Sequence, residues 1–164
     1  MSALHTVSRQ QLRVLVGDLK VAQGPDASII TFALGSCVGL FAWHPHTLQG
    51  GCLHYKLPVH PEGDTSNPYK YGDLGIPTLI RALATDKRDA RNLRLIACGG
   101  AAMGSGSDTR RVGKRNIAIM KKFLWKHGLV LLSEDLGGDI ARTAELNLAN
   151  GTVTVQARNT LTTL

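Results

Sequence analysis

The chain has 164 residues, 43% of them apolar, which suits one domain built around a single substantial core. No stretch approaches the roughly 18 to 20 consecutive apolar residues that a membrane helix needs. Residues 1–11 lack the apolar segment of a secretory signal. These features argue against membrane insertion and secretion, and we expect a single cytoplasmic domain over residues 1–164.

Charge and cysteine usage narrow the function classes further. The formal net charge of +7 favours an acidic partner, and nucleic acid, an anionic membrane and an acidic protein surface all satisfy it. Only 5% of the residues are aromatic, so the stacking platform of a single-strand nucleic-acid binder is largely missing. Cys37, Cys52 and Cys98 are an odd, widely spaced set and a poor disulfide framework, which leaves a thiol free for chemistry.

The first third of the chain is predicted to form strands. Short segments rich in β-branched and large apolar residues are separated there by Gly, Pro or Asp, and they cover residues 12–16, 19–22, 28–32, 38–43 and 50–57. The polar, proline-containing residues 57–70 are interpreted as a loop that overhangs part of the fold.

A first helix is predicted after this loop. Asp73 is the expected N-cap of a helix that runs to about Asp86, with Leu74 and Ile76 on its buried stripe. The apolar residues 93–97 then predict a buried strand.

The last part of the chain adds a second helix and further strands. A glycine-rich turn over residues 99–106 precedes a helix predicted at 114–127, and a strand is predicted at 129–133. Asn150-Gly151 is a strong hairpin signal between two final strands. Strands at both ends with two helices between them predict an α+β fold, an α/β layered sandwich of β-sheets packed with two main helices.

The clearest chemical pattern surrounds Cys37. This cysteine follows Gly35-Ser36 where a loop turns into an apolar strand, so backbone amides near Ser36 and Cys37 could serve an oxyanion. His54 lies on the next predicted strand, where an imidazolium would lower the pKa of the thiol and supply a thiolate. Thr31 is the nearest candidate to hold the imidazole in one tautomer. Without further pattern, a buried core cysteine and a structural histidine remain the commoner interpretation.

Several further motifs, which follow one another along the chain, indicate a protein family. T-x-x-L-G-S-C occupies residues 31–37, and G-G-x-x-H with a following L-P occupies 50–58. Further matches are Y-G-D at 71–73, G-G-A with Met at 99–103, G-x-R-N at 113–116 and E-D-L-G-G at 134–138. Together these motifs resemble the CheD family of chemoreceptor glutamine deamidases over nearly the whole chain.

The resemblance implies a fold, an activity and partners. The fold would be a sandwich similar to the catalytic domain of the cytotoxic necrotising factor toxins. The activity would be hydrolysis of selected glutamines of methyl-accepting chemotaxis receptors to glutamates, with release of ammonia and no cofactor. Cys37 matches the nucleophile, His54 the base and Thr31 the orienting hydroxyl of that family. Certain members also bind the phosphatase CheC, which competes with the receptor.

Two departures from the family pattern concern packing or substrate choice more than catalysis. Cys52 stands where the family usually has methionine, and the block after Gly138 is looser than usual, with Arg142 as its clearest match.

A zinc site is the main alternative for the cysteines. Cys52 and His54 share a strand face, and Cys37 and Cys98 could add ligands. No Cys-x-x-Cys knuckle completes the set, so we interpret Cys52 and Cys98 as core thiols and expect no metal.

Other features keep more than one interpretation. The run 99–114 fits no phosphate-binding motif, and a binding or gating loop near the active site and a plain connector both remain open. The basic stretch 110–126 is either a solvated helix face or a docking surface, for which the resemblance favours a receptor over nucleic acid. Glu134-Asp135 is a strand-end turn or a support of the site. A binding protein that kept the fold and sequesters a chemotaxis partner is the alternative function.

Four further histidines are expected at the surface, because nothing in the sequence completes a metal set around them. They are His44, His46, His60 and His127.

Overall fold

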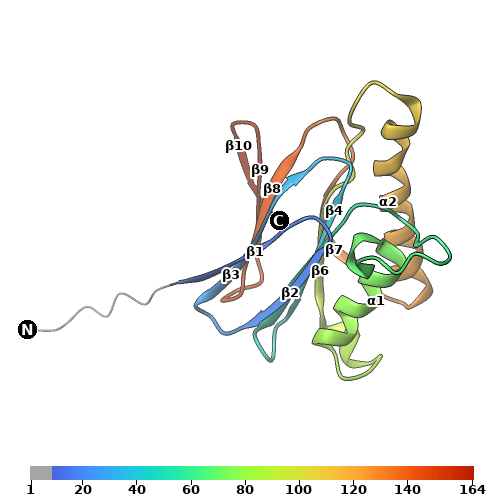
Figure 1. The fold of residues 1–164 in the computed structure, drawn as a ribbon. Coiled ribbons are helices and arrows are strands. Elements are labelled where there is room, and N and C mark those ends of the chain that lie inside the picture. Colours follow the sequence, from blue (N-terminus) through green and yellow to red (C-terminus); the bar gives the residue numbers. More distant parts are fainter. Residues whose placement is uncertain (1–8) are drawn as a thin grey trace, which may run out of the picture.

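The computed structural model describes residues 9–164, and within that range the chain forms two mixed sheets and two α-helices (Figure 1). The first sheet has the order β1-β3-β8-β9-β10, with bounds Gln10–Val14, Ala27–Leu34, Arg142–Asn147, Val153–Ala157 and Thr160–Thr163. The second sheet has the order β2-β5-β4-β6-β7, with bounds Asp18–Gln23, Gln49–Tyr55, Val38–His44, Arg94–Gly99 and Leu131–Leu136. The helices are α1 (Gly72–Leu83) and α2 (Ser107–Lys126), with short 3-10 helices at Pro68–Lys70 and Asp89–Asn92.

The second sheet is the middle of three layers, with the first sheet on one face and the helices on the other (Figure 1). Every residue of β4 is buried, because this strand is covered on both faces. Its side chains alternate: Leu40 joins a cluster with Ile76 of α1, while Phe41 joins a cluster with Ile29 of β3. The predicted α+β layered sandwich is therefore confirmed.

Helix α1 differs from its prediction at its start and on its stripe. Tyr71 is the N-cap, and the Asp73 carboxylate instead accepts hydrogen bonds from the backbone N–H of His60 at 3.0 and 3.1 Å. Asp73 thus ties the preceding loop to the helix. Leu74 is 37% exposed, because it lies roughly 200° around the helix from Ile76 and so falls off the buried stripe.

Helix α2 starts at Ser107, seven residues before the predicted start. The sequence analysis left Gly113 outside the helix, in the run 99–114 that precedes it. In the structure a Cβ at Gly113 would lie 2.4 Å from the Gly100 carbonyl oxygen and 2.5 Å from that of Ala101. Gly113 therefore allows the glycine-rich segment to lie directly on the helix.

The hairpin at Asn150-Gly151 is confirmed between β8 and β9. Gly151 has φ +72° and packs against the Trp43 ring, a position that would exclude any Cβ. Strand β10 was missed because its four residues are exposed and mostly threonine, so they carry no hydrophobic alternation.

His44 is a further correction. It is only 3% exposed and its Nε2 lies 2.9 Å from Asp89 Oδ1, so the expected surface position is wrong. Within the described range, neither helix combines the length and apolarity that a membrane crossing requires.

Candidate active site

The site is built where β3 leaves the first sheet and β4 enters the second. Between Thr31 and Leu34, β3 carries one residue more than its partner strand β8, which is a β-bulge. Ala33 adopts φ +55° within it, a conformation that costs an L-residue about 1 kcal/mol or more. The chain then turns through Gly35 and reaches Cys37 immediately before β4. The bulge and turn thus carry the chain from Thr31 in the first sheet to Cys37 at the entrance of the second sheet.

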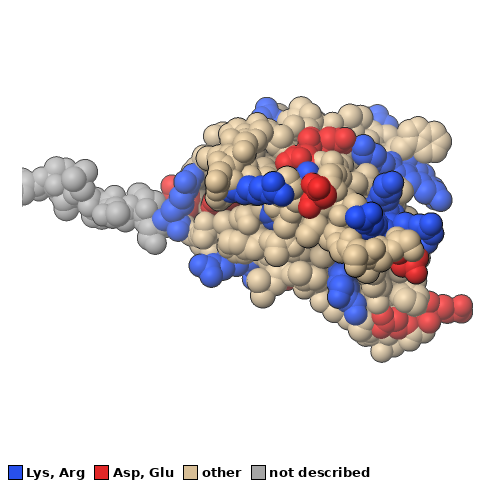
Figure 2. Space-filling model, turned by 90° about the horizontal axis from the view of Figure 1, so that it is seen from above, with Lys and Arg blue, Asp and Glu red and all other residues tan. Residues whose placement is uncertain are grey.

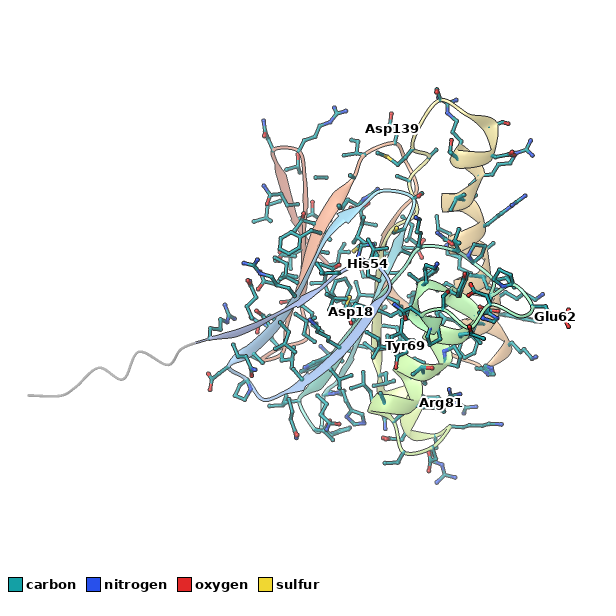
Figure 3. The ribbon with its side chains drawn as sticks, in the orientation of Figure 1. Asp18, His54, Glu62, Tyr69, Arg81 and Asp139 are labelled. Carbon is teal, nitrogen blue, oxygen red and sulfur yellow. The ribbon has the colours of Figure 1, made fainter. Side chains whose placement is uncertain are left out.

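Thr31 and His54 form a buried hydrogen-bonded pair between the two sheets (His54 is labelled in Figure 3). Thr31 Oγ1 lies 2.8 Å from His54 Nδ1 and donates its single proton to the Val14 carbonyl oxygen at 2.7 Å. The hydroxyl must therefore accept from Nδ1–H, which fixes the imidazole tautomer. Among the described residues, His54 Nε2 has no hydrogen-bond partner. The pair leaves a free, buried basic nitrogen.

Cys37 lies on the same sheet face as His54. Gly39 pairs directly with His54, and Cys37 precedes Gly39 by two residues, so Cys37 and His54 are diagonal cross-strand neighbours. Gly39 itself carries no side chain, and the Leu34 and Thr31 side chains pack closely against it. A Cβ there would contact Leu34 at 3.1 Å and Thr31 at 3.4 Å. In residues 9–164 no hydrogen bond joins the Cys37 sulfur to His54, so the geometry brings together Thr31 and His54 directly and Cys37 only as their neighbour.

Burial sets the protonation states of this group. It raises the pKa of the Cys37 thiol, an effect that the positive charge of Lys56 partly offsets. It lowers the pKa of His54 to about 4. At neutral pH these environments favour a neutral thiol beside a neutral imidazole, whereas the sequence interpretation expected a resting thiolate. His54 is thus available as a base rather than as a cation.

Asn116 of α2 holds the two chain segments of the site together, a role that the sequence analysis did not assign. Its Nδ2 donates to the carbonyl oxygens of Ser36 and Lys56, both at 2.9 Å. Tyr55 Oη in turn donates to the Asn116 carbonyl oxygen at 2.6 Å. Asn116 therefore fixes the residue before Cys37 to the strand end beyond His54. The available signal was a polar Asn one turn before Met120, on the apolar buried stripe of an amphipathic helix.

The other predicted features lie as follows. Cys52 and Cys98 are buried in the core between the sheets, which confirms them as core thiols, and burial raises the pKa of Cys98 to about 12. No three His, Cys, Asp or Glu side chains in the described range are grouped to hold a metal ion.

The Glu134-Asp135 pair splits between two partners. Asp135 forms a salt bridge with Arg142 at 2.9 Å, and Glu134 forms one with Lys121 at 3.0 Å. Arg142 also donates to the carbonyl oxygens of Gly137 and Ile140, so Asp135 braces the turn after β7.

A layered α+β chain that packs a histidine and threonine pair beside a cysteine turn has the residue set of a thiol-dependent hydrolase. The family model described as CheD chemotactic sensory transduction matches residues 57–157. A curated relative from Solibacter usitatus, named probable chemoreceptor glutamine deamidase CheD, is 37% identical over 90% of this chain and 89% of its own length. A relative with the same name from Methanococcus vannielii is 40% identical over 90% of this chain and 96% of its own length. The chain belongs to the CheD family, as its motifs predicted.

The matches differ in how they cover the candidate site. The family model begins after Thr31, Cys37 and His54, whereas the two alignments leave out only about a tenth of this chain and so run through residues 31–54. Among solved structures, that of the Neisseria meningitidis protein NMB0706 matches with 9% identity and a TM-score of 0.47. It covers 80% of this chain and 65% of that one. The likeness to the necrotising factor toxins stays a prediction.

Proposed function

We propose that this chain, as one domain, is a protein-glutamine deamidase that converts glutamines of methyl-accepting chemotaxis receptors to glutamates. The names of the relatives, probable chemoreceptor glutamine deamidase CheD, support the substrate class. The observation that carries the mechanism is the Thr31–His54 hydrogen bond, since it leaves His54 Nε2 unprotonated on the face shared with Cys37.

The first half of the reaction forms a thioester. His54 Nε2 takes the thiol proton as Cys37 Sγ attacks the amide carbon of the glutamine side chain. The carbonyl oxygen becomes an oxyanion, for which the Ser36 and Cys37 amides are the proposed donors. Within the described residues neither amide donates to a backbone carbonyl outside the regular strands and helices. Protonated His54 then gives its proton to the leaving nitrogen, and ammonia departs.

The second half of the reaction hydrolyses the thioester and regenerates the free Cys37 thiol. His54 Nε2 accepts a proton from water, whose oxygen attacks the thioester carbon, and the Cys37 sulfur leaves and recovers that proton. The product side chain is a glutamate. Thr31 keeps the imidazole in one tautomer throughout both halves. Every step uses only water and residues of this chain.

The direct test is incubation with a chemoreceptor cytoplasmic fragment, followed by mass spectrometry of its peptides. Specific glutamines should gain the mass that accompanies replacement of an amide NH₂ by OH, and ammonia should appear in equal amount. The Cys37→Ala protein is the matched control. Binding of the fragment without conversion by the unmodified chain would instead favour the partner-sequestering alternative.

Two finer expectations belong to the same proposal. We place the reaction in the cytoplasm, and we take the phosphatase CheC as a second partner on the strength of the family resemblance. Purified CheC should compete with the receptor fragment for this chain. Simultaneous binding of CheC and the receptor fragment, with neither weakening the other, would contradict this competition.

A further inference from the structure

A basic hollow lies against the segment that packs on the Cys37 turn, and among the described residues its cations form no salt bridge. The hollow has a volume of about 480 Å³, and Arg110, Arg111 and Lys114 of α2 line it together with Ala102 and Asp139. Salt bridges among the described residues involve other cations, and none of these three takes part in one. Among the described residues, Asp139 is the only acidic residue that lines the hollow, so the charge of this lining is positive overall.

Backbone contacts connect the hollow to the candidate nucleophile. Ala101 N–H donates to the Gly35 carbonyl oxygen and Ala102 N–H to that of Gly138, both at 2.8 Å. Met103 packs against Gly35, two residues before Cys37. Ala102, which lines the hollow, therefore directly follows the residue that is hydrogen-bonded to the Cys37 turn. Figure 2, which looks down on the molecule, shows Lys and Arg side chains gathered over the helical side.

A glutamine side chain is neutral, so unpaired cations beside the nucleophile contribute nothing to binding the reacting amide by charge. They do favour carboxylates on the same segment, since electrostatic complementarity selects partners and speeds their association. We propose that Arg110, Arg111 and Lys114 receive acidic side chains near the target glutamine, so that the chain selects glutamines in acidic protein segments. This inference rests on the proposed function and specifies its substrate class.

The test measures binding separately from turnover. Two labelled peptides each carry one glutamine in an alanine-rich helical frame. One has glutamates three and four residues on either side of the glutamine, on the same helix face, and the other has alanines there. Fluorescence anisotropy with the Cys37→Ser chain should give about tenfold tighter binding of the acidic peptide at low ionic strength. Salt should reduce that preference.

Two triple variants test which cations cause the preference for the acidic peptide. Arg110→Ala/Arg111→Ala/Lys114→Ala should remove it, while Arg81→Ala/Lys122→Ala/Lys126→Ala, which removes the same charge elsewhere, should retain most of it. The proposal is overturned if the Cys37→Ser chain with its hollow intact binds both peptides equally. It is also overturned if the two triple variants lose the preference for the acidic peptide to the same extent. Displacement of the acidic peptide by short DNA with higher affinity would also overturn it in favour of nucleic-acid binding. Tight acidic-peptide binding without deamidation by the active chain would instead contradict the proposed function alone.

Discussion

Strand β5 presents two different surfaces from neighbouring residues. Leu53 and Tyr55 face the helices and pack into an aliphatic cluster, whereas Cys52 and His54 face the first sheet. All four are fully buried. The helical face is stabilised by apolar packing, while the sheet face holds a histidine whose Nε2 has no hydrogen-bond partner in residues 9–164. An unpaired buried polar atom costs free energy, so the unpaired His54 Nε2 favours a functional role for the sheet face of β5.

The largest effect should come from removing the sulfur itself. Cys37→Ala should reduce deamidation of a receptor fragment to background, because the thioester cannot form. Its urea midpoint should stay near that of the unsubstituted protein, since Cys37 is only partly buried. Residual turnover at a comparable rate in the folded variant would contradict the nucleophile assignment.

The two faces of β5 can be separated by substituting adjacent residues. Leu53→Ala should cost about 2 to 5 kcal/mol in the free energy of unfolding, because it leaves a cavity against α1. Turnover per folded molecule should largely survive.

His54→Gln should instead affect turnover more than stability. Loss of the base should lower turnover about 100-fold or more, with a smaller loss of stability. Urea titrations and deamidation rates on both proteins check the pair. Equal loss of activity in the two variants would mean that β5 serves the site only as a scaffold.

Asn116 should behave as a positioning residue, and Met120 on the same buried stripe is its control. Both are fully buried, and Asn116→Ala and Met120→Ala should each destabilise the protein by about 2 kcal/mol or more. Only Asn116→Ala should release the Ser36 and Lys56 carbonyls. Turnover should then fall about tenfold with a matching fall in the rate of Cys37 alkylation. Unchanged alkylation would reduce Asn116 to a structural role.

These comparisons also show how far the sequence could be interpreted. The strands β4 and β5, the Asn150-Gly151 hairpin and the α+β class follow from local patterns and were predicted correctly. The family motifs drew attention to Thr31, Cys37 and His54, whose catalytic roles stay predictions. Periodicity and turn signals are local, and they succeed where neighbours along the chain decide the structure.

The missed features depend on contacts between distant segments. Gly113 is tolerated inside α2 because the segment around Gly100 packs on it, and Asn116 is recognisable only once Ser36 lies beside it. His44 is buried through Asp89, which follows it by 45 positions. No pattern within one segment could reveal these pairings.

Acid should destabilise the sheet face in a defined window. Because burial lowers the pKa of His54 to about 4, the unfolded chain binds more protons than the folded one between about pH 6.5 and 4. Stability should therefore fall as pH drops through that window, by up to about 3 kcal/mol from this residue. His54→Gln should flatten the dependence, and urea midpoints at several pH values measure it. The same slope in both proteins would place the titrating group elsewhere.

The smallest expected effect concerns Thr31, which acts on the imidazole and not on the sulfur. Burial raises the pKa of Cys37, so alkylation by iodoacetamide should be slow near neutral pH and rise steeply above it. His54→Ala should slow alkylation near neutral pH if Nε2 takes the thiol proton, and this difference should shrink as the pH rises. Thr31→Ala should alter alkylation less but still lower turnover several-fold, because Nδ1 loses the acceptor that fixes its tautomer. If all three proteins titrate alike, Cys37 and His54 do not interact in the free chain, and the pair would have to assemble on the substrate.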